Sequence, residues 1–208
     1  MLATAASLAQ GVVNADNNGT GVPIFIEDAS GVIDGGDLVK IGTPAQAAGF
    51  AGAGPGQVAI NLYAAPDSVA HGSMATILSG GTLLFSGFNV PSTLATFQGH
   101  VAPGSDFVLP TSAGFDGAQP VDFLFTARAT VNGSLAYGVS SVGVIQPLSP
   151  HQAATGSLPP YIWGTGSGSG ITGLVLTSDS LVASVPEPST IVLGGLGMAA
   201  GLAFRRRK

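Results

Sequence analysis

Cysteine and charge are what this 208-residue sequence has least of. It contains no cysteine, and only 8% of its residues are charged. The first absence excludes disulfides, thiolate nucleophiles and zinc–thiolate sites, so the fold must rely on its apolar core. The second disfavours long surface helices, which are normally rich in Glu, Lys and Arg.

Basic residues are scarcer still outside the end of the chain. Four of the six are the last four residues, and the other two are Lys40 and Arg128. The residues before this basic end therefore carry two basic and eleven acidic side chains, a net charge of −9. Because binding to a phosphate backbone needs a basic patch, this charge excludes nucleic acid as a partner of the domain.

Glycine and apolar residues are abundant instead. The chain has 32 Gly and 14 Pro, and short runs of Val, Ile, Thr, Phe and Leu lie between Gly, Pro, Asn and Ser. This pattern favours short strands joined by turns. It predicts an all-β domain over residues 10–184, an antiparallel β-sandwich of jelly-roll type.

The clearest β signal lies between residues 121 and 144. Apolar residues alternate with polar ones up to Val131, and Asn132-Gly133 is the preferred two-residue hairpin turn. In the return strand the alternation shifts, which predicts a bulge near Ser140-Ser141. Further strands are expected at residues 22–27, 38–41, 58–63, 82–85, 93–101, 171–177 and 181–185.

The two ends of the chain carry targeting signals. Residues 1–9 look like the end of a secretory signal peptide, because a short apolar stretch leads to the small-x-small site Ser7-Leu8-Ala9. Residues 190–204 are uncharged and would span about 22 Å as a helix, which is a short membrane helix. Four cations follow it as a stop-transfer signal on the cytoplasmic side: Arg205, Arg206, Arg207 and Lys208.

A short motif precedes this helix. Pro186-Glu187-Pro188-Ser189, the Gly/Ala-rich apolar segment and the terminal Arg cluster together resemble the PEP-CTERM sorting signal of Gram-negative and related bacteria. The resemblance covers residues 185–208 and makes Pro186, Glu187 and Pro188 the recognition motif. It implies that an exosortase, a membrane enzyme, removes the tail from an intermediate anchored in the inner membrane. It also implies a destination at the cell surface or beyond, in association with exopolysaccharide and biofilm matrix.

No motif for catalysis stands out in the ectodomain. Gly168 to Gly173 matches G-x-G-x-x-G, but a loop precedes it and a β-like run follows, so it is read as a linker. The three histidines are expected in exposed loops. Residues 14–19 begin like a calcium loop, but Phe25 stands where the bidentate Glu is required, so an Asx-rich turn is expected. Asp34 and Asp37 are expected at a hairpin tip.

Three functions follow as expectations. The first is a non-catalytic surface or matrix protein that needs no cofactor and no metal. The second is a carbohydrate-binding module in which Tyr161 and Trp163 stack on sugar rings; the alternative interpretation is that Trp163 packs over the end of the domain and holds its loop. The third is a secreted hydrolase with an acidic pair such as Asp106 and Asp116.

Overall fold

The computed structural model describes residues 11–18, 20–27, 39–43, 52–104, 107–110, 115, 119–131, 133–149, 152, 155–164 and 169–177. The predicted signal segment, the strand expected at 181–185 and the sorting tail at 185–208 lie outside these residues. Within the described part, no helix is long and apolar enough to cross a membrane. The helix predicted at 190–204 is not among the residues described.

The described chain is mostly strand, with two short helices between β4 and β5. The elements are β1 (Val12–Val13), β2 (Ile24–Glu27), β3 (Val39–Lys40), β4 (Ala59–Pro66), α2 (Asp67–Ala70), α3 (Met74–Gly80), β5 (Thr82–Phe88), the 3-10 helix η1 (Ala95–Phe97), β6 (Phe107–Val108), β7 (Val121–Val131), β8 (Ser134–Val139), β9 (Gly143–Ile145) and β10 (Leu174–Thr177).

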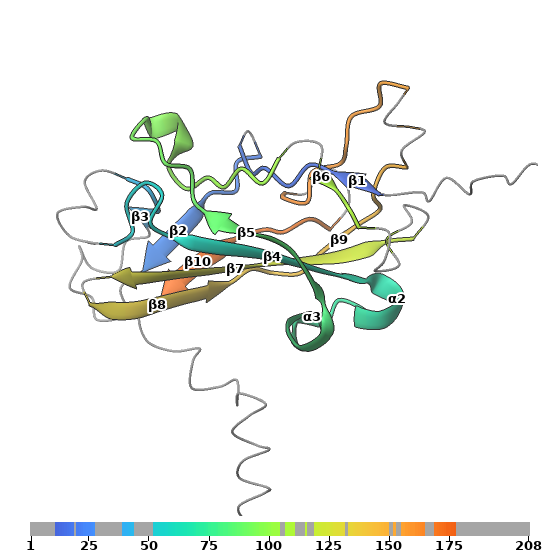
Figure 1. The fold of residues 1–208 in the computed structure, drawn as a ribbon, viewed down its shortest axis with the longest axis horizontal. Helices are drawn as coiled ribbons and strands as arrows, with labels where there is room; N and C mark the ends of the chain where they lie inside the picture. The colour runs from blue at the N-terminus through green and yellow to red at the C-terminus, as the bar shows by residue number, and fades with distance from the viewer. Residues whose placement is uncertain are drawn as a thin grey trace, which may run out of the picture.

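One large mixed sheet carries the fold (Figure 1). Its strand order is β3-β2-β10-β8-β7-β4-β5, with β9 beside one end of β7, and β1 and β6 form a separate two-stranded sheet. All pairs are antiparallel except β10 and β2, which run parallel with Leu174 opposite Ile24. The β-rich class is confirmed, but a purely antiparallel sandwich is wrong for the described residues. A parallel pair of strands far apart in sequence leaves no local signature.

Strand β7 confirms the sequence prediction most closely. Its core-facing side chains are buried at every second position from Val121 to Val131. Val131 pairs with Ser134, so the hairpin loop is two residues long, and Gly133 has a φ of 83°. Strand β8 ends before Ser140, whose Oγ accepts a hydrogen bond from the Phe125 amide, and pairing to β7 resumes at β9. The predicted irregularity near Ser140 is therefore present.

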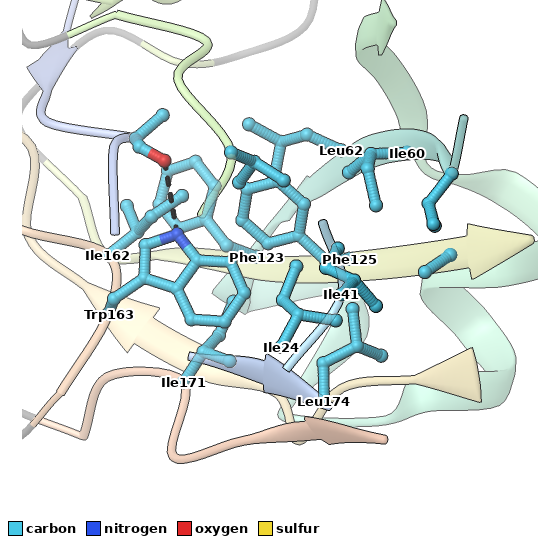
Figure 2. Close-up of a cluster of buried hydrophobic side chains, with 14 of the residues drawn as sticks. Ile24, Ile41, Ile60, Leu62, Phe123, Phe125, Ile162, Trp163, Ile171 and Leu174 are labelled. Carbon is cyan, nitrogen blue, oxygen red and sulfur yellow. Dashed lines mark hydrogen bonds between the residues drawn. The ribbon is translucent and has the colours of Figure 1, made fainter. Parts of the chain in front are cut away.

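The main core lies on one face of the large sheet. Its largest side chains are Trp163, Phe115, Phe123 and Phe125, and Figure 2 shows Trp163, Phe123 and Phe125 beside several Ile and Leu residues. Val13 from β1 and Leu109, which follows β6, belong to the same cluster, so the small sheet and nearby loops cover this face. Burial of this apolar surface is the main source of stability in a chain without disulfides.

The two short helices cover part of the opposite face, which we call the outer face (Figure 1). Here Ala65, Ala70, Ile77 and Leu124 form a second buried cluster. Helix α3 begins at an N-cap, Ser73, whose side chain accepts a hydrogen bond from the Thr76 amide. These helices were not expected from the sequence, because segments of four and seven residues are too short for a helical period to stand out.

The strand expected at residues 93–101 is wrong. That segment contains η1 and a turn, and its end is held by the buried side chain of Asn17. The side-chain Nδ2 of Asn17 donates to the Gly99 carbonyl at 3.0 Å, and its Oδ1 accepts from the Val101 backbone amide at 2.8 Å. Backbone groups that a strand would pair with a neighbouring strand are thus satisfied by a distant side chain.

Candidate functional site

The predicted carbohydrate contact at Trp163 is corrected by its burial. Its ring is 1% exposed and stacks on Phe125 at a centroid distance of 4.5 Å. The indole Nε1 donates to the Ala15 carbonyl at 3.0 Å, the dashed line in Figure 2. Trp163 therefore has no face to offer a sugar and instead joins its loop to the N-terminal segment, which was the alternative interpretation.

Tyr161, two residues away, lies at the surface. It is 42% exposed, and the backbone on both sides of it is bonded to Asn14: the Asn14 amide donates to Pro160 and the Ile162 amide donates to Asn14. The ring is therefore presented from a fixed backbone. A sugar contact at Tyr161 stays a prediction.

The turn at residues 14–18 is stabilised by its own side chains. Asn14 Oδ1 accepts from the Asp16 amide at 3.0 Å, and Asp16 Oδ1 accepts from the Asn18 amide at 2.7 Å. These are Asx-turn bonds, which satisfy oxygens that a calcium loop would direct at the ion. Among the described residues, no group of three His, Cys, Asp or Glu side chains could hold a metal ion.

The histidines differ in environment. His71 is exposed and follows α2 with a φ of 48°. His100 is only partly exposed, and its Nδ1 is buried without a hydrogen-bond partner. Burial lowers the pKa of His100, which favours the neutral form of the ring. The expectation of an exposed loop histidine is thus wrong for His100, and His151 lies outside the described residues.

The structure brings together two carboxyl groups that sequence reasoning missed. Asp122 of β7 is fully buried beneath the turn between α2 and α3, and its Oδ2 accepts from the Gly72 amide at 2.6 Å. Burial is the largest cause that raises the pKa of Asp122, and the nearby carboxyl group of Asp67 raises it further. Two carboxyl groups so placed favour sharing one proton. No local signal distinguished Asp122, because it alternates like any outward-facing polar residue.

Burial limits what this acidic pair can do chemically. A general acid or base must reach the substrate, and Asp122 has no exposed surface. Its oxygen bonds the backbone that connects the helices, so the pair serves to hold α2 and α3 on the sheet. The acidic pair proposed for a hydrolase, Asp106 and Asp116, lies outside the described residues, as do Asp34 and Asp37.

The outer face contains an exposed cation beside an aromatic side chain. Arg128 is exposed there, with Ala59 opposite it on β4 and Tyr137 opposite it on β8. Burial raises the pKa of Tyr137, and the nearby Tyr63 raises it further. This combination offers a planar donor and tyrosine rings on a rigid sheet.

The sorting residues Pro186, Glu187, Pro188 and the cations from Arg205 to Lys208 lie outside the described residues. Their identity is decided by comparison with known families. Residues 184–208 match the PEP-CTERM protein-sorting motif. The match confirms the resemblance seen in the sequence and implies an exported protein that an exosortase processes. No curated protein and no solved structure matches the chain.

Proposed function

We propose that this protein is an exported, non-catalytic component of the cell surface or extracellular matrix. In this proposal its PEP-CTERM tail anchors it in the inner membrane until an exosortase removes it. The observation that carries the proposal is the motif at residues 184–208, followed at once by cations. The non-catalytic part of the proposal draws on the acidic pair found among the described residues, because Asp122 in that pair is fully buried and bonds the backbone between α2 and α3.

Mass spectrometry of the mature protein from its native host tests the processing. We expect a chain that lacks residues 190–208 and whose new C-terminus lies near the motif. Glu187→Ala should retain the tail, whereas Asp179→Ala, which removes the same charge outside the motif, should be processed normally. A mature surface form that still ends at Lys208 would sink the processing proposal.

Carbohydrate binding is a second candidate, favoured by Arg128 between Ala59 and Tyr137 on the outer face. Arg128→Ala should reduce retention of the protein on its host's exopolysaccharide, while Thr130→Ala, an exposed position on the same strand, should not. Tyr161→Ala tests the loop in the same assay. Unchanged retention in both Arg128→Ala and Tyr161→Ala would remove this candidate.

A further inference from the structure

Among the described strands, β5 forms one edge of the large sheet. It lies at the end of the strand order and pairs, among the described strands, with β4 alone. None of its residues is buried, whereas Ile60 and Leu62 in the adjacent β4 are fully buried. Leu83 and Phe88 are 51% and 61% exposed. The outward backbone groups of β5 are therefore available for another strand.

This edge lacks most of the usual protection against pairing. Edge strands are normally short, charged, interrupted by Pro or covered. The opposite edge follows this rule, because β3 has two residues and ends in the exposed Lys40. Strand β5 has seven residues and neither charge nor Pro.

One feature of β5 does protect it in part. The register to β4 shifts between Leu62 and Tyr63, which leaves Leu84 as a bulge. Bulges twist an edge away from a flat partner. However, Phe85–Phe88 pair in unbroken register with β4, so a four-residue segment keeps regular strand geometry.

We propose that β5 is a self-association edge, where two copies of this chain pair antiparallel about a two-fold axis and continue one sheet across both. An antiparallel edge related by a two-fold axis is complementary to itself. Pairing also brings the apolar side chains of Leu83 and Phe88 toward those of the partner copy, which removes them from water.

The charge distribution favours a second copy as the occupant. Outside its basic end the chain carries a net charge of −9, so copies repel one another over most of their surface. No Asp, Glu, Lys or Arg occurs from Ser68 to Ser105, the segment that contains β5. Contact through β5 keeps the like charges apart, and a charged peptide would find no counter-charge on this strand.

The cysteine-free sequence permits a direct test on the full chain in mild detergent. Ser86→Cys places a single thiol on the outer face of β5, and Thr130→Cys places one on the same face of the interior strand β7. Under mild oxidation we expect at least about tenfold more disulfide dimer from Ser86→Cys, because paired edges raise the effective thiol concentration. Equal yields would mean that the tail or micelle joins the copies without β5, and would overturn the proposal.

A charge at the edge supplies the second measurement. Leu83→Lys added to Ser86→Cys should lower the dimer yield to that of Thr130→Cys, because a lysine on an edge strand disfavours pairing with another chain. Leu83 is half exposed, so the fold should persist, which circular dichroism checks. If the Leu83→Lys variant misfolds, Phe88→Lys serves the same purpose. An undiminished yield in the folded variant would overturn the proposal.

Discussion

Trp163 shows at the scale of one residue how burial separates packing from recognition. An aromatic side chain in a Pro/Gly-rich loop is compatible with a sugar-stacking platform and with a core anchor. The contacts with Phe125 and the Ala15 carbonyl identify it as an anchor. Buried aromatic side chains contribute strongly to stability through the apolar area they remove from water.

Replacing Trp163 should therefore destabilise the domain. We expect Trp163→Ala to lower the free energy of unfolding by about 3–5 kcal/mol, the usual cost of deleting a buried aromatic ring. Trp163→Phe should cost less, because it keeps an aromatic ring in the core, although it loses the hydrogen bond to the Ala15 carbonyl. Urea unfolding followed by circular dichroism measures both variants. A Trp163→Ala variant as stable as the wild type would contradict this role.

At the scale of elements, the docking of α2 and α3 depends on a buried acid. Asp122 bonds the Gly72 amide, and its other oxygen is buried without a partner. The pKa of Asp122 is raised, so the folded state binds its proton more tightly than the unfolded state. Stability is then greatest below the ordinary pKa of an aspartate and falls as the pH rises to the folded pKa.

Asp122→Asn should remove this pH dependence. An amide can accept from Gly72 and donate toward Asp67 without a charge, so the variant should gain about 1 kcal/mol at neutral pH, the cost of an unpartnered buried acceptor. The gain should shrink as the pH falls toward the ordinary aspartate pKa of about 4, because protonation of Asp122 removes its buried charge. Urea unfolding across this range measures the difference. Asp16→Asn, a control in an unrelated turn, should show the same pH profile of stability as the wild type. If Asp122→Asn also shows the wild-type pH profile, the result would argue against the proton-linked contact.

At the scale of the whole molecule, the sorting tail and the described domain are separate in sequence. Every described strand ends by Thr177, and the sorting motif begins at residue 184. The last strand, β10, lies between β2 and β8 inside the sheet. Removal of the tail therefore takes away none of the described strands, which suits a segment that an enzyme cuts off.

A chain that ends at Val185 should unfold at the same urea concentration as the full-length chain in the same detergent. The physical reason is that the core residues of the described part of the chain all precede residue 178. Circular dichroism at matched protein concentration makes the comparison. A clear loss of stability on truncation would show that the tail packs on the domain.

The sequence alone determined the features that depend on neighbouring residues. Period-two alternation marked β4 and β7, Asn132-Gly133 marked the hairpin, and the order of motif, apolar segment and cations marked the sorting tail. Only the tertiary structure decided the parallel pairing of β2 with β10, the burial of Trp163 and the contact between Asp67 and Asp122. These last features join residues that lie far apart in the chain, and no local pattern encodes which distant segments will meet around the core.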